Sequence, residues 1–386
     1  MHRTLWRRAP DGTAAVPRAR SPDPGGPRGE ALSGTAGRKA ARTGLRKIAD
    51  LGPGVRDVVF TDDGHLLVLD AEARLWRAGL TSGSSEPSGD FPEPSGGFPK
   101  SPGEPSGRFS ELPGGGDAIG IAVRRAFPWA GPHLDVVPRQ VSWHRGPAAT
   151  VVRADCGGHW CLAGRTGAGS WLPLLTGSAT VSDPDPSWSP DGTRLAVGVD
   201  GVRVVDLPWT GRRTGPWADY EAEVWGWTPS GRLLLYHFDG DRWSLSVVSP
   251  ARGTRPRALG APYADFEEWG WPVGLAVAGG GGTCVVAFRR ALVRYALPSL
   301  EVVGVVPADG FVGQLTPSTG RRHAATESED GVQVWDLATG VPLTEPLTGF
   351  QSARLSPSGR FLACRAVAPA DPSSSAEPGW SIWRPG

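Results

Sequence analysis

One unit recurs along this chain at intervals of about 40 to 48 residues and constrains its fold more than any other feature. Its clearest copy spans residues 311–349, where short segments of alternating apolar and polar residues are separated by a turn of Pro, Ser, Thr and Gly. Alternation over four to eight residues is typical of a strand with one buried face. The unit therefore predicts a meander of antiparallel strands.

The most regular strand of this unit occurs seven times, in residues 73–78, 159–164, 202–207, 245–250, 292–297, 332–337 and 380–385. The last six of these begin 43, 43, 47, 40 and 48 residues apart, and the first gap of 86 residues contains an insertion of 36 residues. Such spacing, with four strands per copy, is typical of propeller blades. We predict an all-β fold, a seven-bladed β-propeller of four-stranded antiparallel blades.

The closure of the ring follows from the last copy, which supplies three obvious strands. The missing fourth strand is predicted to come from residues 45–51, which alternate apolar and polar side chains and precede a Gly-Pro-Gly sequence. A ring closed by both ends of the chain leaves no open sheet edge at the seam. We therefore expect residues 45–51 to pair with residues 380–385.

A tight turn separates the first two strands of several copies. Residues 189–192 have Ser, Pro, Asp and Gly at the positions that a type I turn favours, and residues 228–231 and 356–359 repeat this pattern. The corresponding turn at residues 316–320 has one extra residue, and residues 278–282 are mostly glycine.

The second copy follows the insertion and is less regular. We expect strands at residues 118–124 and 136–143, and a hairpin formed by residues 150–154 and 159–163.

Composition excludes several classes of protein. The 386 residues include 40 basic and 39 acidic side chains, so the net charge of +1 gives no overall attraction to nucleic acid or to an anionic membrane. Four cysteines are too few for a disulfide scaffold, which favours the reducing cytoplasm. No apolar run is long enough to span a membrane. The residues after Arg7 and Arg8 are Ala, Pro, Asp and Gly, so no export signal is expected there.

Two segments are predicted to be disordered, and the propeller is predicted to occupy residues 45–386. Residues 1–44 hold nine basic and three acidic side chains among Pro, Gly and Ala, so we expect a basic arm that binds nucleic acid weakly or not at all. Residues 81–116 contain three near-copies of one hexapeptide, at 86–91, 93–98 and 104–109. We interpret them as an expanded surface loop, with a multivalent binding motif as the alternative.

The repeats resemble those of the WD40 family from about residue 45 to residue 386. Residues 332–340, with the sequence VQVWDLATG, are similar to the closing strand and turn of that family and include its Trp-Asp pair. The Gly-His pair that opens a WD40 repeat is missing, since Gly349 and Phe350 stand in its place, so the resemblance is to a divergent bacterial type. Residues 187–196 also resemble TolB-type repeats. The resemblance implies a scaffold that binds proteins or peptides.

The sequence gives little indication of a catalytic or metal site. Cys156, His159 and Cys161 have zinc-ligand chemistry, but a fourth ligand has no obvious source, so we favour packed thiols on a hairpin whose tip is Gly157 and Gly158. The seven histidines do not recur at one position of successive copies. We predict no catalytic residues, no metal and no cofactor.

The best candidates for function are the connections between blades, where aromatic and acidic side chains occur together. Such residues make good anchors for a partner, here a basic one. The predicted partner-binding residues are Trp217, Tyr220, Glu267, Glu268, Trp269, Phe311 and Phe350. For Trp76, Trp335 and Trp383 we predict packing between blades instead.

We therefore predict a monomeric, non-catalytic scaffold that binds a protein or peptide on one face of the propeller. The alternative is an enzyme or small-ligand binder that uses the central channel, which a row of His or carboxylate side chains around the axis would favour.

Overall fold

The computed structural model describes residues 44–52, 54–72, 74–80, 109–111, 117–127, 135–144, 149–167, 169–178, 186–198, 202–207, 222–239, 242–249, 261–262, 269–270, 272–308, 310, 312–318, 320–367 and 378–385. All of them belong to one compact unit, Ala41–Gly386. Most of the predicted arm and most of the predicted insertion lie outside the described residues. No helix in the described part is long and apolar enough to cross a membrane.

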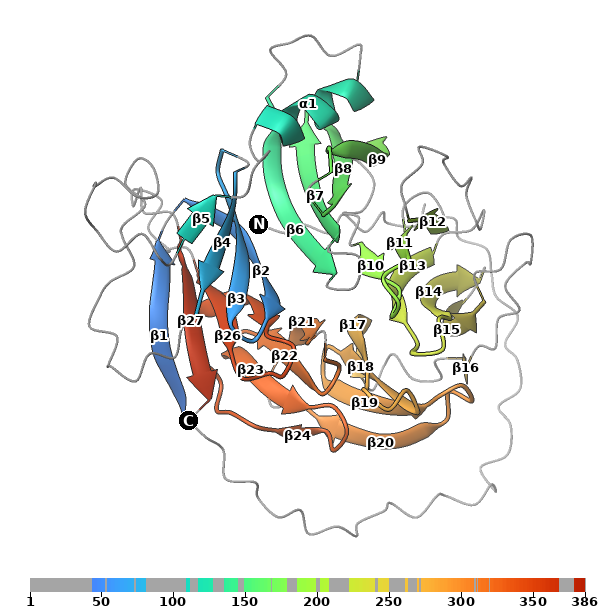
Figure 1. Ribbon diagram of the computed structural model, residues 1–386. Helices are drawn as coiled ribbons and strands as arrows, with labels where there is room; N and C mark the ends of the chain where they lie inside the picture. Colours follow the sequence, from blue (N-terminus) through green and yellow to red (C-terminus); the bar gives the residue numbers. More distant parts are fainter. Residues whose placement is uncertain are drawn as a thin grey trace, which may run out of the picture. The chain divides into compact units, whose positions relative to one another are not determined.

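Seven antiparallel sheets form the blades of a propeller (Figure 1), as predicted, and in the described residues six of them have four strands while blade 3 has three. Blade 1 consists of β2 (Val55–Asp62), β3 (His65–Asp70), β4 (Leu75–Gly79) and β5 (Phe109–Glu111). Blade 2 consists of β6 (Val137–His144), β7 (Ala149–Cys156), β8 (His159–Thr166) and β9 (Leu172–Ser178). Blade 3 consists of β10 (Ser187–Trp188), β11 (Arg194–Gly198) and β12 (Val202–Asp206).

Blade 4 consists of β13 (Ala222–Trp227), β14 (Leu233–Asp239), β15 (Arg242–Val248) and β16 (Ala261–Pro262), and blade 5 of β17 (Pro272–Val277), β18 (Thr283–Phe288), β19 (Ala291–Ala296) and β20 (Val302–Pro307). Blade 6 consists of β21 (Val312–Pro317), β22 (His323–Ser328), β23 (Gly331–Asp336) and β24 (Val341–Pro342). Blade 7 consists of β25 (Phe350–Leu355), β26 (Leu362–Ala366), β27 (Trp380–Pro385) and β1 (Leu45–Gly52). Each predicted third strand is therefore present in its own sheet.

Blade 7 is closed by the strand that precedes all the others in the chain. β1 pairs antiparallel with β27, from Leu45 opposite Pro385 to Gly52 opposite Trp380. Ala49 and Leu51 are buried in one core with Trp380 and Ile382, so the pairing is held by apolar packing as well as by backbone hydrogen bonds. The predicted closure is confirmed.

The tight turns between the first and second strands share one hydrogen-bond pattern. The amide of the fourth turn residue donates to the carbonyl of the first in Ser189–Gly192, Thr228–Gly231, Ala278–Gly281 and Ser356–Gly359. Where the first residue is Ser or Thr, its Oγ also accepts an amide from the start of the next strand. These side chains fix the turns that the sequence predicted.

The turn of blade 6 is shifted relative to the prediction. β21 continues to Pro317, and the turn runs from Ser318 to Arg321, whose amide donates to the Ser318 carbonyl. β21 has six residues, like β13, β17 and β25, and the fourth turn position falls on Arg321 instead of Gly320.

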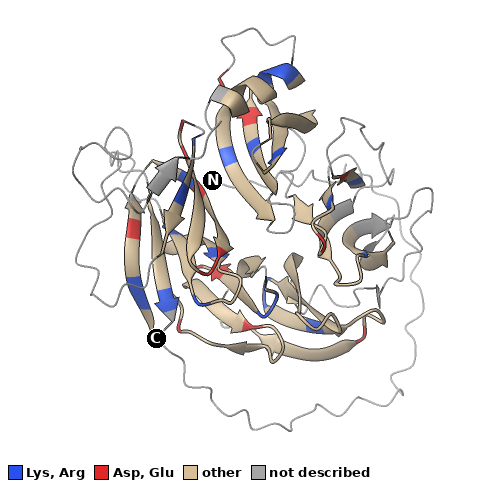
Figure 2. Ribbon diagram, viewed as in Figure 1, with Lys and Arg blue, Asp and Glu red and all other residues tan. Residues whose placement is uncertain are grey.

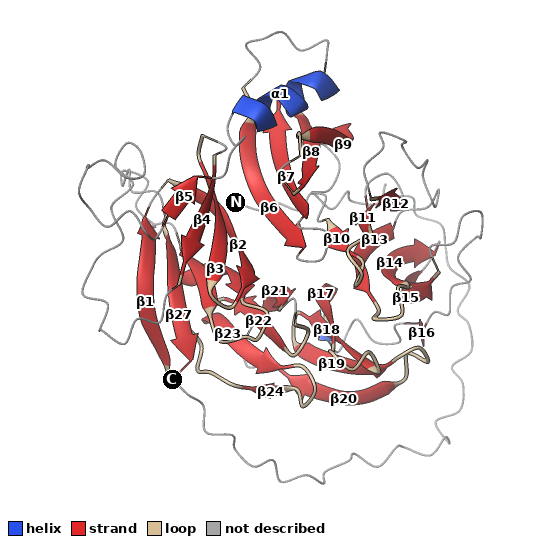
Figure 3. Ribbon diagram, viewed as in Figure 1, coloured by secondary structure: helices blue, strands red, loops and turns tan. Residues whose placement is uncertain are grey.

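Residues 118–124, predicted as a strand, belong to the helix α1 (Asp117–Ala126), and that prediction is wrong (Figure 3). Ile119, Ala122 and Val123 are buried, as the spacing i, i+3, i+4 of one helix face requires, and they share a core with blade 2. α1 contacts β8 and β9.

Blade 1 obtains its fourth strand from the far end of the predicted insertion. Phe109 pairs with Ala78, and Glu111 pairs with Trp76. Residues 81–108 therefore join the third and fourth strands of one blade.

Candidate functional site

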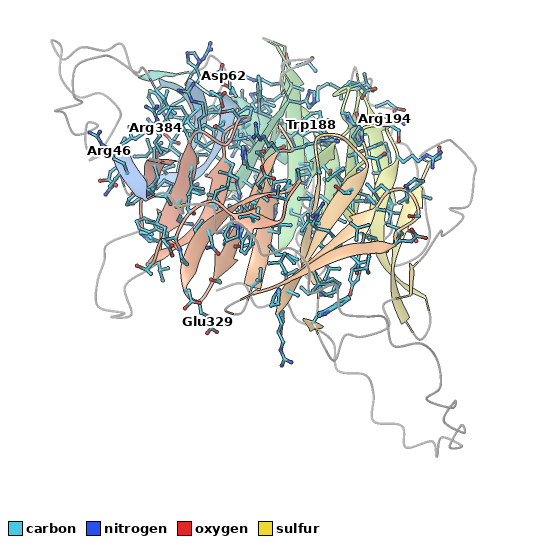
Figure 4. The ribbon with its side chains drawn as sticks, turned by 90° about the horizontal axis from the view of Figure 1, so that it is seen from below. Arg46, Asp62, Trp188, Arg194, Glu329 and Arg384 are labelled. Carbon is cyan, nitrogen blue, oxygen red and sulfur yellow. The ribbon has the colours of Figure 1, made fainter. Side chains whose placement is uncertain are left out.

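The strand order gives the propeller two faces. We define the turn face as the end of the blades that carries the turns between first and second strands. The connection face is the opposite end, with the turns between second and third strands and the connections between blades. In Figure 4, Asp62 and Arg194 lie at one end of the blades and Glu329 lies at the other. Basic and acidic residues are interspersed around the ring and do not gather on one blade (Figure 2).

The predicted partner-binding residues occur in the sequence before, or at the start of, the first strands of blades. Trp217, Tyr220, Glu267, Glu268 and Phe311 lie outside the described residues, so their roles remain predictions. Trp269 and Phe350 are described, and both are half-buried.

Trp269 packs on the blade that it precedes. Its ring centroid lies 5.5 Å from that of Phe288, and its carbonyl accepts a hydrogen bond of 3.0 Å from the Arg290 amide. The side chain also contacts the core shared by blades 4 and 5. One side of Trp269 therefore supports the fold, and the rest of the side chain is exposed.

Phe350 begins β25 and makes an edge-on contact with Trp383, with 5.3 Å between ring centroids. Trp383 belongs to β27, so this pair spans two strands of blade 7. Trp76 and Trp335 are buried, and their indole groups donate to Asp70 (2.9 Å) and Thr326 (2.8 Å). Trp76 of blade 1 shares a core with blade 7, and Trp335 of blade 6 shares a core with blade 5, so these two tryptophans pack between blades, as predicted.

An acidic turn on this face was missed in the sequence. Glu329 and Asp330 connect β22 to β23 and are both exposed. Gly310 lies so close that a Cβ at this position would be 2.5 Å from Asp330 Oδ2. Asp330 therefore lies against the connection that continues into the predicted residue Phe311. The sequence Glu-Ser-Glu-Asp-Gly marks an acidic turn, but not its proximity to Gly310.

Glu327 joins this turn to the next blade. Its Oε1 accepts a hydrogen bond of 2.8 Å from the Ala353 amide in β25. This bond links β22 of blade 6 to the strand that begins with Phe350, so the acidic turn and the aromatic side chain are held on neighbouring blades.

The Cys156, His159 and Cys161 group has the predicted hairpin geometry. Gly157 and Gly158 form the tip with φ values of 51° and 79°. Both cysteines are buried, and burial raises the pKa of Cys156 to about 11 and that of Cys161 to about 12. The His159 ring lies 5.5 Å from Phe127. Protonated thiols are poor metal ligands, and no three His, Cys, Asp or Glu side chains among the described residues are placed to hold a metal ion.

Among the described residues of the inner strands, Asp57 is a buried carboxylate that is held by groups of the neighbouring blades. Asp57 of β2 accepts a hydrogen bond of 2.9 Å from the Val141 amide and lies 3.3 Å from Arg354 Nη2. It therefore joins blade 1 to blades 2 and 7. Burial raises the pKa of Asp57, and Arg354 opposes that shift. In the part of the chain that is described, Asp57 has a role in joining blades and does not belong to a row of acids.

Comparison with known proteins supports the fold. No protein-family model matches this chain, and neither does any curated protein sequence. Among solved structures, a chain of the "Crystal Structure of Mitotic Checkpoint Complex" is similar over 98% of both chains, with 13% identity and a TM-score of 0.51. Raptor from Chaetomium thermophilum is similar over 90% of this chain, with 12% identity and a TM-score of 0.55, and the similarity spans 29% of the Raptor chain. These likenesses support the WD40-like resemblance at the level of the fold.

Proposed function

We propose that this chain is a non-catalytic scaffold whose connection face binds a basic segment of a protein partner. The observation that carries the proposal is the exposed Glu329–Asp330 turn, which lies beside Gly310 and next to the blade that begins with the half-buried Phe350. Carboxylates beside aromatic side chains suit Lys and Arg, which pair with acids and also stack on rings.

Two further observations support a scaffold. One similar solved structure is, by its title, a complex. Within the described residues, the inner-strand carboxylate Asp57 is paired with Arg354 and the Val141 amide. It is therefore occupied in joining blades, and does not support the alternative of an enzyme that uses an acid in the central channel. We also propose a bacterial cytoplasmic location and a monomeric state. The four free, buried cysteines suit a reducing compartment.

The test is selection of displayed random peptides on the folded protein. We expect the selected peptides to be rich in Arg, Lys and aromatic residues, and to lose binding to the double variant Glu329→Lys/Asp330→Lys. The matched control is Asp206→Lys/Glu301→Lys, which makes the same change of charge at two exposed residues of the turn face. Peptides that bind both double variants equally, or that carry no net positive charge, would contradict the proposal.

The predicted aromatic residues are tested separately. Replacing Trp217, Tyr220 and Trp269 by Ala should remove binding of the selected peptides while the circular dichroism spectrum of the protein is unchanged. Loss of folding in this triple variant would assign these side chains to the core instead. Phe311→Ala and Phe350→Ala, together with Glu267→Gln/Glu268→Gln, extend the same comparison to the remaining predicted residues.

A further inference from the structure

Arg321 occupies a backbone conformation that the equivalent turns reserve for glycine. Its φ is 56°, and the corresponding residues Gly192, Gly231, Gly281 and Gly359 have φ values of 69°, 74°, 70° and 75°. A side chain with a Cβ is disfavoured in this left-handed region, so a residue found there points to a function rather than to stability.

The turn that holds Arg321 contacts the turns of both neighbouring blades. On one side, a Cβ on Gly320 would overlap the carbonyl oxygen of Pro357 in blade 7. On the other, a Cβ on Gly279 in blade 5 would lie 3.5 Å from the Arg321 carbonyl oxygen. Since the first strands of the blades surround the axis, these turns form the rim of the central opening on the turn face.

The charge of Arg321 acts on a residue at the opposite side of this rim. Burial lowers the pKa of His144 in blade 2, Asp191 opposes this shift, and the charge of Arg321 adds to it. Blades 2 and 6 are separated by two blades on one side of the ring and three on the other, so this effect acts across the opening. His144 lies 5.7 Å from the ring of Trp188, and the Trp188 indole donates to Ser142 Oγ at 2.7 Å.

The charge of Arg321 is not balanced by a carboxylate in the described part of the chain. Its guanidinium is half-buried, burial lowers its pKa, and it makes no ion pair with a described residue. Asp191, the acid that acts on His144, accepts hydrogen bonds within its own turn from Ser189 Oγ (2.5 Å) and the Thr193 amide (3.0 Å). Burying a cation without a partner is costly, so the site suits an anion from outside.

Further basic side chains surround this position on the turn face. Arg232, Arg322 and Arg360 each follow a tight turn, and all three are exposed. Arg322 lies 3.8 Å from Asp336. The acids of blade 1 are engaged locally, because Asp62 accepts from the Gly64 amide (2.7 Å) and Asp63 accepts from the Ser358 amide (3.0 Å). In the described turns around the opening, arginines outnumber carboxylates, with Arg194, Arg232, Arg321, Arg322 and Arg360 against Asp62, Asp63 and Asp191, while Asp206 and Glu301 are exposed farther out on this face.

We propose that the turn face is a second docking surface, which binds an acidic segment of a protein partner and seats one of its carboxylates on Arg321 at the central opening. A planar guanidinium pairs with a carboxylate through two parallel hydrogen bonds. The exposed arginines Arg232, Arg322 and Arg360 attract the flanking acidic residues. This surface is separate from the connection face, so the two sites are independently testable.

The decisive variant is Arg321→Gly, because glycine adopts the observed φ without strain. We expect its melting temperature to equal or exceed that of the wild type, while its affinity for an acidic peptide falls at least about tenfold. The probe is a fluorescein-labelled peptide of alternating Glu and Gly residues, measured by fluorescence anisotropy. The matched Gln and Gly peptide should not bind.

Two controls separate this site from its alternatives. Glu329→Lys/Asp330→Lys should bind the acidic peptide as the wild type does, and Arg321→Lys should bind with intermediate affinity because it keeps the charge but loses the planar pair. Equal affinity of Arg321→Gly and the wild type would overturn the proposal, as would no binding at millimolar peptide. Stronger competition by inorganic phosphate or by a single-stranded oligonucleotide than by the unlabelled acidic peptide would also overturn it, in favour of a phosphate site.

Discussion

Arg354 Nη2 lies 3.3 Å from Asp57 Oδ1, and this ion pair joins the inner strand of blade 7 to the inner strand of blade 1. The Asp57 side chain is 3% exposed and that of Arg354 is 22% exposed. A carboxylate so deeply buried depends on its partner, because removing one member of a buried pair leaves an uncompensated charge.

The first prediction concerns the pH dependence of this pair. Burial raises the pKa of Asp57 above its ordinary value, so its contribution to stability is present below the pKa of the unfolded chain and is lost as the pH rises through the folded pKa. Arg354→Gln removes the charge that opposes this shift. We expect it to lower the free energy of unfolding by about 3 kcal/mol near neutral pH and by less at about pH 4.

Urea denaturation at the two pH values measures this difference. The double variant Asp57→Asn/Arg354→Gln has no buried charge at either position and should regain part of the stability, with a smaller dependence on pH. A loss caused by Arg354→Gln that is the same at both pH values would show that Arg354 acts through packing alone.

The second prediction concerns closure by β1. Deleting residues 1–52 removes Ala49 and Leu51 from the core and leaves the edge of β27 unpaired, so we expect a loss of at least about 3 kcal/mol and aggregation. Deleting residues 1–43 keeps β1 and is the matched control. Size-exclusion chromatography and thermal denaturation compare the two. Equal stability of both deletions would mean that the ring does not need this strand.

The third prediction uses the contact between turns. Gly320 and Gly280 hold the same position in the turns of blades 6 and 5, but a Cβ would overlap Pro357 O at Gly320 and meets nothing within 4 Å at Gly280. We expect Gly320→Ala to destabilise the protein by about 1 to 3 kcal/mol and Gly280→Ala to change its stability by less than about 0.5 kcal/mol. Chemical denaturation measures both. Similar values would imply that the turn of blade 6 moves away freely.

The fourth prediction concerns β20, the outer strand of blade 5. Val302, Val303 and Val305 are 51%, 49% and 42% exposed, and the strand carries no charge. The outer strands β5, β16 and β24 have only two or three residues, β1 carries Arg46, Lys47 and Asp50, and β9 contacts α1. A long apolar edge promotes association between copies.

We expect Val303→Lys/Val305→Lys to slow aggregation of concentrated protein without lowering its melting temperature. Light scattering over time measures the rate. The control is Val367→Lys, which changes a valine that is 50% exposed but lies outside the strands. If both variants aggregate at the same rate, net charge rather than the edge of β20 is responsible.

The sequence predicted the blades because each strand repeats the same short pattern in seven copies, so a weak preference in one copy is supported by the others. It also located β1, since a blade with three strands needs a fourth. The helix α1 could not be predicted in this way because it occurs once. Its residues Ile119, Ala122 and Val123 fit a helix face, but the β-branched Ile119, Ile121 and Val123 also alternate as the residues of a strand do.

The candidate sites were predicted less completely. Side-chain chemistry pointed to aromatic residues and acids in the connections, and Trp269 and Phe350 do lie where blades begin. The proximity of Asp330 to Gly310 depends on how two blades meet, which no local pattern contains. The place of Arg321 at the fourth position of its turn was not predicted, because the pairing of β21 with β22 decides where that turn begins.

The pairing of β1 with β27 also sets the order of events during synthesis. β1 leaves the ribosome before every other strand, yet its partner is among the last segments to be translated. Ala49 and Leu51 therefore remain exposed to water, or bound to a chaperone, while the first six blades are synthesised. The nascent chain becomes resistant to proteases at this seam only after β27 has emerged from the ribosome.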